Sequence, residues 1–376
     1  MKKNILFISI FLGILSCGIT KKDDIRKFDN SLRGTTFNRS TVSWKIDLSK
    51  SSENTFGKTD YSAPTIIDED TLVFTNKNKA YLVDYNKGII LSKKKLSYTV
   101  MSPIIKVGKN LIFFASDGEI HLVDRDFNKV WNYKLDFEKV VGSFYIEKNS
   151  IIFKTSKDKV ISLGKDGKIK WTTDSYLSDF MPLLTDSKLL ITNQFVFAGF
   201  SNGRFIILDK KDGKTIHEQT LSSLEQFNDI VSTPIEKNNI VYIPSFAKGI
   251  IAFDYISKEI IWNTNFPTIS SLFMTSLGDF YLNNDYLVKI DSKSGKILKK
   301  SKLSIDRMLS SFLHNDRYIV ITSSKKGVSL LDLKNMTNFS IDISSGVSTN
   351  PIFIDKQNII ILSNNGVLYR IRLLIK

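Results

Sequence analysis

The sequence has only one cysteine, Cys17, among its 376 residues. One cysteine cannot form a disulfide within a chain, so the fold must be held by its apolar core and its hydrogen bonds. Histidine is scarce as well, and His121, His217 and His314 each lack a second histidine or a cysteine at ligand spacing. We therefore expect no metal site.

Catalytic motifs are missing in the same way. The chain has no Gly-x-Ser-x-Gly elbow and no glycine-rich loop of the kind that holds phosphates. We therefore expect no catalytic residues, no cofactor, no small-molecule substrate and no enzymatic activity.

Long hydrophobic runs are absent too. The most apolar stretch, Ile5–Leu15, is 11 residues long and follows a basic start, Met1-Lys2-Lys3. It is too short to span a bilayer and is typical of the core of a secretory signal peptide. The stretch ends in Ile14–Cys17, which resembles the lipobox of bacterial lipoproteins, although a plain signal peptide with an incidental cysteine is an alternative.

The lipobox resemblance implies three segments. Residues 1–16 would be a lipoprotein signal peptide, 17–40 a lipidated Cys17 followed by a polar, flexible tether, and 41–376 the folded body. By comparison with Gram-negative sorting, Gly18 after the cysteine favours the outer membrane. We therefore expect a lipid-anchored protein that faces the periplasm.

The body repeats one unit eight times. A proline or serine followed several residues later by an apolar triplet recurs at intervals of 39, 40, 39, 52, 37, 40 and 40 residues. These intervals are close to the length of a four-stranded propeller blade. The anchors are Pro64, Pro103, Ser143, Pro182, Pro234, Ser271, Ser311 and Pro351.

Each unit contains short apolar runs separated by polar turns, a pattern typical of short strands. Such small sheets must stack on neighbours, and a ring leaves no open end. The last unit lacks an outer strand, while Val42–Asp47 precedes the first unit and resembles one. The sequence therefore predicts an all-β, single eight-bladed β-propeller, closed by the N-terminal strand pairing with the last blade.

A recurring aspartate follows an apolar run in six units and precedes a turn that often contains glycine. We expect these side chains to accept hydrogen bonds from the backbone of their own turns instead of forming a site. They are Asp84, Asp124, Asp209, Asp254, Asp291 and Asp332.

The formal charge is 53 − 38 = +15. The lysines are spread through the turns of all repeats without interleaved aromatics, so we expect no nucleic-acid site. A solvated, lysine-rich surface is the simplest interpretation, with a loose attraction to anionic envelope surfaces as the alternative.

The repeats resemble those of quinoprotein-type eight-bladed propellers. They share the proline-led first strand, the turn at Ser201–Arg204 and a tryptophan in the outer strand, whose place other residues such as Leu298 take in some units. The resemblance implies that the indole docks on the neighbouring blade and serves packing. The tryptophans are Trp44, Trp131, Trp171 and Trp262.

Together with the lipobox and the length, these features resemble the BamB family, lipoprotein subunits of the outer-membrane β-barrel assembly machinery. Two stretches strengthen the resemblance: Gly199–Arg204, and Leu224–Pro234 in the long connection before the fifth unit. The family resemblance implies that this connection and Asp174–Met181 bind the periplasmic domains of BamA. The partner-binding residues that we predict are Leu177, Phe180, Gln226, Phe227 and Asp229, with glutamine where the family has arginine.

Three functions remain open from the sequence. The first is a non-enzymatic scaffold that binds BamA and other subunits of the assembly machinery. The second is another exported propeller that binds an envelope protein, lipid or peptidoglycan. The third is a quinone-dependent dehydrogenase, which usually carries a vicinal cysteine pair that Cys17 alone cannot provide.

Overall fold

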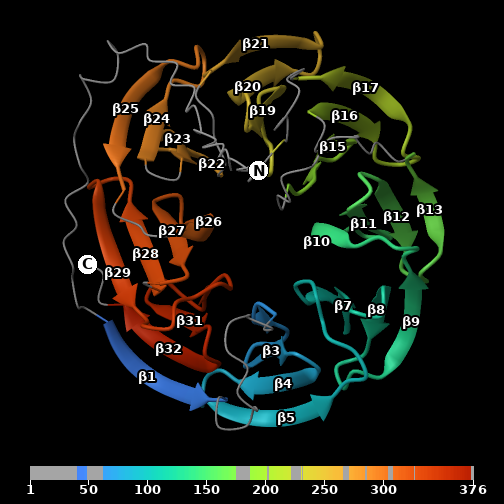
Figure 1. Cartoon of the computed structure of the whole chain (residues 1–376), viewed down its shortest axis with the longest axis vertical. Coiled ribbons are helices and arrows are strands. Elements are labelled where there is room, and N and C mark those ends of the chain that lie inside the picture. The colour runs from blue at the N-terminus through green and yellow to red at the C-terminus, as the bar shows by residue number, and fades with distance from the viewer. Residues whose placement is uncertain are drawn as a thin grey trace, which may run out of the picture.

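The computed structural model describes residues 40–48, 62–174, 187–200, 203–221, 230, 232–265, 271–283, 286–303, 308–325 and 327–373. These residues form eight four-stranded antiparallel sheets arranged around a central axis, as Figure 1 shows. None of them belongs to a helix with the length and apolar character needed to cross a membrane. The predicted all-β propeller of eight blades is confirmed.

Seven blades each take four consecutive strands, ordered from the axis outward. Blade 1 contains β2 (Thr65–Ile66), β3 (Thr71–Asn76), β4 (Lys79–Asp84) and β5 (Ile89–Lys95). Blade 2 contains β6 (Ile105–Val107), β7 (Asn110–Phe114), β8 (Glu119–Val123) and β9 (Lys129–Lys134). Blade 3 contains β10 (Val140–Ile146), β11 (Ser150–Thr155), β12 (Val160–Gly164) and β13 (Ile169–Thr172). Blade 4 contains β14 (Leu190–Ile191), β15 (Phe195–Gly199), β16 (Arg204–Asp209) and β17 (Thr215–Thr220).

The second half of the ring follows the same order. Blade 5 contains β18 (Ile235–Lys237), β19 (Ile240–Ser245), β20 (Gly249–Asp254) and β21 (Glu259–Asn263). Blade 6 contains β22 (Leu272–Thr275), β23 (Gly278–Asn283), β24 (Tyr286–Ile290) and β25 (Ile297–Lys302). Blade 7 contains β26 (Met308–His314), β27 (Tyr318–Ser323), β28 (Gly327–Asp332) and β29 (Thr337–Asp342). Blade 8 contains β30 (Ile352–Phe353), β31 (Asn358–Leu362), β32 (Val367–Leu373) and β1 (Ser40–Asp47).

The two ends of the chain meet in blade 8. Strand β1 pairs antiparallel with β32, from Ser40 opposite Leu373 to Asp47 opposite Val367. This pairing confirms the predicted closure. Strand β1 begins at Ser40, one residue before the predicted start of the folded body at residue 41. Figure 1 shows β1 in blue beside the red strands of the C-terminus.

The core lies between the blades. The middle strands are buried on both faces, because each blade is covered by a neighbour on either side; in β3, for example, every residue is buried. The outer strands, such as β5, are mostly exposed. The described apolar residues form eight clusters, and each cluster joins two adjacent blades. The repeat is therefore stabilised mainly by contacts with its neighbours.

The four tryptophans reinforce four of these junctions, as the resemblance implied. Trp44 of blade 8 donates from Nε1 to the carbonyl oxygen of Tyr85 in blade 1, at 3.1 Å. Trp131, Trp171 and Trp262 likewise donate to Lys165, Lys210 and Ser292 of the next blade, at 2.8, 3.2 and 3.1 Å. Each indole therefore fastens an outer strand to the following blade.

Leu298 does not occupy the tryptophan position of blade 6. The strand has a bulge there, so that Lys299 pairs with Lys289 while Leu298 is left unpaired and 45% exposed. Trp131 and Trp262 sit beside equivalent bulges. If the bulge is ignored, counting along the sequence assigns the tryptophan position to Leu298 instead of Lys299.

The six recurring aspartates act as turn residues, as predicted. Asp84, for instance, accepts hydrogen bonds at Oδ1 from the backbone nitrogens of Asn86 and Lys87, both at 2.9 Å. The other five accept the corresponding bond from the residue two positions on. Backbone hydrogen bonds, that from Lys87 first, lower the pKa of Asp84.

Candidate functional site

The residues that we predicted for function lie outside the described part of the chain. They are Cys17, Leu177, Phe180, Gln226, Phe227 and Asp229. The structure therefore leaves these predictions untested, but it describes the blades from which both predicted loops emerge.

The antiparallel order of the strands assigns each connection to a face of the ring. Turns between the second and third strands share one face with the inter-blade connections, and all other turns lie on the opposite face. We call the first the connection face. Both predicted loops, 174–181 and 220–233, are inter-blade connections, so they leave the ring on the connection face, before blades 4 and 5.

The longer loop is anchored at both ends in the core between blades 4 and 5. Leu221 and Ile230 are 6% and 1% exposed, and both belong to the same apolar cluster. Ile230 donates its backbone N–H to the oxygen of Phe200 and forms a bridge with Ser245. A Cβ atom on Gly199 would lie 2.5 Å from the Ile230 side chain, which gives a physical reason for glycine at the start of the family-like Gly199–Arg204 stretch.

A buried lysine supports the same region. Lys154 on β11 is 4% exposed, and its ammonium donates to the backbone oxygen of Gly199 at 2.9 Å. The ammonium also lies 5.7 Å from the centre of the Phe200 ring. This lysine links blade 3 to the end of β15, beside the anchor of the long loop. Nothing in the sequence around Lys154 distinguished it from the many surface lysines.

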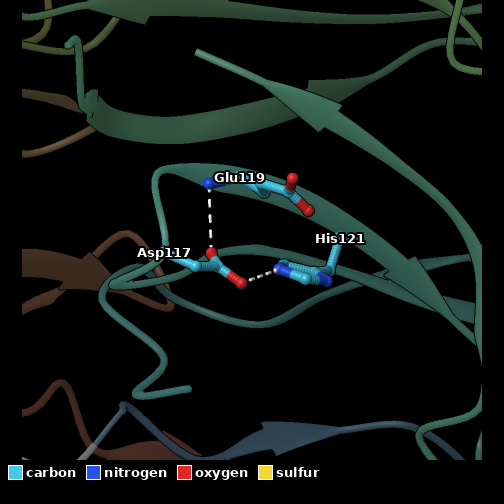
Figure 2. Close-up of side chains that lie close together, drawn as sticks. All are labelled: Asp117, Glu119 and His121. Carbon is cyan, nitrogen blue, oxygen red and sulfur yellow. Dashed lines mark hydrogen bonds and ion pairs between the residues drawn. The ribbon is translucent and has the colours of Figure 1, made fainter. Parts of the chain in front are cut away.

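A second cluster on the connection face lies on the turn between β7 and β8. His121 Nε2 lies 2.9 Å from Asp117 Oδ2, and the backbone nitrogen of Glu119 donates to Asp117 Oδ1 at 3.1 Å. Figure 2 shows both bonds converging on Asp117. The Glu119 carboxylate accepts instead from the side-chain amide of Asn132. One ligand atom from each of the three acidic or imidazole side chains lies within 4.8 Å of the others.

Sequence reasoning missed this cluster because it searched for paired histidines and cysteines. The usable signal was an Asp-x-Glu-x-His alternation entering a strand, where residues two apart share a face. Asp117 and His121 bond each other and the Glu119 carboxylate bonds Asn132, so all three side chains have partners in a network that fixes the turn. His121 is also packed on Tyr98, with ring centres 4.1 Å apart.

The other two histidines also stack on aromatic rings. His217 occupies the tryptophan position of blade 4, opposite Ile207, and stacks on Phe253 of blade 5 with centres 5.4 Å apart. His314 stacks on Phe353 of blade 8 at 3.5 Å, and burial lowers the pKa of its imidazole. Both join blades to each other.

The opposite face has a cavity of about 670 Å³ between blades 1 and 2. Arg125 bridges it by an ion pair with Asp68 at 2.9 Å and a hydrogen bond to Thr71 at 3.0 Å. Lys106 donates to the oxygen of Ile67. The charged groups of Arg125 and Lys106 are thus bonded to neighbouring groups. The cavity lies on the face of the ring opposite the predicted partner loops.

The fold, the docked tryptophans and the aspartate-led turns define an eight-bladed β-propeller with quinoprotein-type repeats. A family profile described as outer membrane protein assembly factor BamB matches residues 126–338, more than half of the chain. The chain belongs to this BamB family.

Individual relatives are distant. The outer membrane protein assembly factor BamB of Yersinia pestis is 24% identical over 231 residues, and the match covers 58% of each chain. That of Nitrosomonas eutropha is 30% identical over 164 residues, which cover 41% of this chain and 39% of the relative. The matched part thus spans 58% of the length of the first of these curated relatives and 39% of the second.

Solved structures share the fold over a longer stretch. The crystal structure of BamB from Moraxella catarrhalis has a TM-score of 0.68 at 15% identity, covering 89% of this chain and all of that one. A europium-containing methanol dehydrogenase also gives a TM-score of 0.68, at 10% identity, covering 89% of this chain and 93% of that one. At these identities the likeness concerns the fold alone.

Proposed function

We propose that this chain is a non-enzymatic scaffold lipoprotein that assists the assembly of outer-membrane β-barrel proteins. The observation that carries the proposal is the family match over residues 126–338, which includes blades 3 to 6 and both predicted loops. The proposed place of action is the periplasmic side of the outer membrane, with the lipid on Cys17 as the anchor.

The proposed partner is the periplasmic part of BamA, bound on the connection face together with other subunits of the machinery. Rigid frameworks commonly carry binding residues on loops. The long loop has such a framework at both ends, because Leu221 and Ile230 are buried in one core cluster. The proposed contact residues are Leu177, Phe180, Gln226, Phe227 and Asp229.

A binding experiment tests this proposal. The purified chain without its signal peptide and Cys17 would be immobilised and exposed to the periplasmic domains of BamA from the same bacterium. We expect saturable binding by the wild type. The triple variant Leu177→Ala, Phe227→Ala, Asp229→Lys should bind at least tenfold more weakly, about 1.4 kcal/mol.

The matched control is Lys211→Ala. Lys211 lies in the turn after β16, on the face opposite the predicted loops, so its removal should leave binding unchanged. Both variants should melt at the wild-type temperature. Full binding by a folded triple variant would remove these loops as the site.

The second candidate left open by the sequence is a quinone-dependent dehydrogenase, and a methanol dehydrogenase shares this fold. An absorbance spectrum of the protein purified from its own bacterium distinguishes the two. A quinone cofactor band, retained through gel filtration, would support the enzyme; a spectrum with protein bands only supports the scaffold.

A further inference from the structure

One aromatic side chain on the connection face is fully exposed. Phe137 lies in the connection between β9 and β10 and is 100% exposed. Its φ angle is 55°, in the left-handed region that bulky residues rarely adopt. Both the exposed ring and the backbone angle are unfavourable in the isolated chain, so packing of Phe137 in its own fold gives no reason for its presence.

The backbone on both sides of Phe137 is fixed to the ring. Leu135 is buried and donates its N–H to the oxygen of Gly118 in blade 2, at 2.9 Å. Lys139 exchanges two hydrogen bonds with Ser156 in blade 3, at 3.0 and 2.8 Å. The connection is therefore pinned to the turns of two neighbouring blades.

An ion pair holds the residue next to Phe137. Glu138 is 6% exposed and lies 2.7 Å from Nζ of Lys159, while Lys157 donates to the oxygen of Asp136 at 3.2 Å. With its neighbours tied down on both sides, the connection presents the Phe137 ring outward at a fixed place. A rigidly presented aromatic loses little conformational entropy on binding.

The connection that carries Phe137 precedes blade 3. The next connection along the ring, before blade 4, carries Leu177 and Phe180, and the one after that carries Phe227. Phe137 therefore extends the predicted partner surface by one blade, to the side that the family resemblance did not indicate.

We propose that Phe137 is an anchor residue that inserts into an apolar pocket of the protein partner bound on the connection face. This inference rests on the proposed function. Aromatic residues at the centre of an interface carry a large share of binding energy when a polar rim surrounds them.

The charges around Phe137 favour a protein over a lipid surface. Five carboxylates and four ammonium groups lie on the connection and the two turns that hold it, so their formal charges sum to −1. A local charge of −1 gives no attraction to anionic lipid, although the chain as a whole is at +15. These residues are Asp117, Glu119, Asp136, Glu138 and Asp158, and Lys134, Lys139, Lys157 and Lys159.

The test compares Phe137→Ala with Ile256→Ala in binding to the periplasmic domains of BamA from the same bacterium. Ile256 is a matched control, because it is 65% exposed on a turn of the opposite face. We expect Phe137→Ala to weaken binding at least tenfold and Ile256→Ala to leave the Kd unchanged. Equal binding by Phe137→Ala and the wild type would overturn the inference and leave the proposed function standing.

A glycine variant separates binding from folding. Glycine adopts a φ of 55° without strain, so Phe137→Gly should keep or raise the melting temperature while it loses affinity. A lower melting temperature with unchanged affinity would show that the ring serves the fold, against the inference.

Two further outcomes are distinguishable. If the wild type does not bind the BamA domains at all, the proposed function fails and the inference fails with it. If the wild type sediments with vesicles of phosphatidylethanolamine and phosphatidylglycerol, and Phe137→Ala does not, the ring serves a membrane and the protein-partner inference is wrong.

Discussion

The indole of Trp44 lies flat against Gly88 across the junction between blade 8 and blade 1. A Cβ atom on Gly88 would lie 2.6 Å from Cγ and Cδ2 of the indole, so only glycine fits under the ring. The same arrangement recurs between Trp131 and Gly167, Trp171 and Gly213, and Trp262 and Gly295, where the added Cβ would lie within 2.4 to 2.9 Å of the ring. Tryptophan and glycine thus occur as pairs on adjacent blades.

Where a blade lacks the tryptophan, the facing turn of the next blade lacks the glycine as well. The equivalent turn position is Lys258 in blade 5 and Met336 in blade 7, both with positive φ angles, of 63° and 52°. The outer strands that face these turns carry His217 and Lys299 at the tryptophan position. Because no indole covers the turn there, a side chain fits and the glycine is not required.

Removing the closing indole should destabilise the ring. Trp44 is half-buried and donates to Tyr85, so we expect Trp44→Ala to lower the free energy of unfolding by about 2 kcal/mol. Val42→Ala, at a 56% exposed position of the same strand, should cost less than about 0.5 kcal/mol. Urea unfolding of the wild type and the two variants measures these costs. Equal midpoints for the wild type and Trp44→Ala would mean that the indole does not stabilise the junction between blades 8 and 1.

Adding a methyl group under the indole should also destabilise the ring. Gly88 and Gly108 both have positive φ angles, of 71° and 62°, but a Cβ atom on Gly108 would meet nothing within 4 Å. Gly108→Ala should therefore cost only the backbone strain, about 1 kcal/mol, whereas Gly88→Ala should cost about 1 to 3 kcal/mol more.

The double variant Trp44→Ala, Gly88→Ala checks the cause of that difference. If the clash is responsible, removal of the indole should cancel most of the extra cost of Gly88→Ala. Strict additivity of the two single effects in thermal unfolding would contradict this explanation.

Acid should weaken blade 7 through Asp332. Burial alone would raise the pKa of this carboxyl, but hydrogen bonds from Arg317 and from the backbone of Lys334 and Asn335 outweigh it, and the pKa lies below its usual 3.8. Arg317 Nε donates to Asp332 Oδ1 at 2.9 Å. A lowered pKa contributes stability above pH 3.8 that is lost as the pH falls through the folded-state value.

Two variants resolve this contribution in urea titrations below pH 5. Asp332→Asn should be less stable at neutral pH and should lose less further stability in acid than the wild type. Arg317→Gln should shift the acid loss to higher pH, because the carboxylate is then buried without its guanidinium partner. If both variants lost stability in acid at the same pH and by the same amount as the wild type, Asp332 would not be the source of this pH dependence.

Anchoring can be tested at Cys17. If the lipobox resemblance is correct, Cys17→Ser should block lipidation and processing, and the unprocessed chain should appear as a larger species in whole cells. Labelling with a palmitate analogue, followed by fractionation, measures both effects. Ser16→Ala, beside it, should be processed normally, and continued labelling of Cys17→Ser would exclude this anchor.

The ring was predictable from the sequence because its repeats bury one another. Buried strands such as β3 and β31 keep their apolar runs, and the closing strand could be identified because Trp44 repeats the pattern of Trp131. The exposure of Phe137 was not predictable, because its charged neighbours do not fix it: Asp136 is exposed, whereas Glu138 is buried. Lys154 was also missed, since its burial depends on Gly199, 45 residues further on.

The tryptophan–glycine pairs reinforce four of the eight junctions between blades and leave the others without an indole. Junctions 8–1, 2–3, 3–4 and 5–6 carry the indole bond, whereas 1–2, 4–5, 6–7 and 7–8 do not. Those four combine apolar packing with other contacts, such as the Arg125–Asp68 ion pair at 1–2 and the histidine stacks at 4–5 and 7–8. The junction where the two chain ends meet is therefore one of the four that have an indole bond. Amide hydrogens should exchange faster along the junctions without an indole than along this one, so local opening is expected where the chain is covalently continuous.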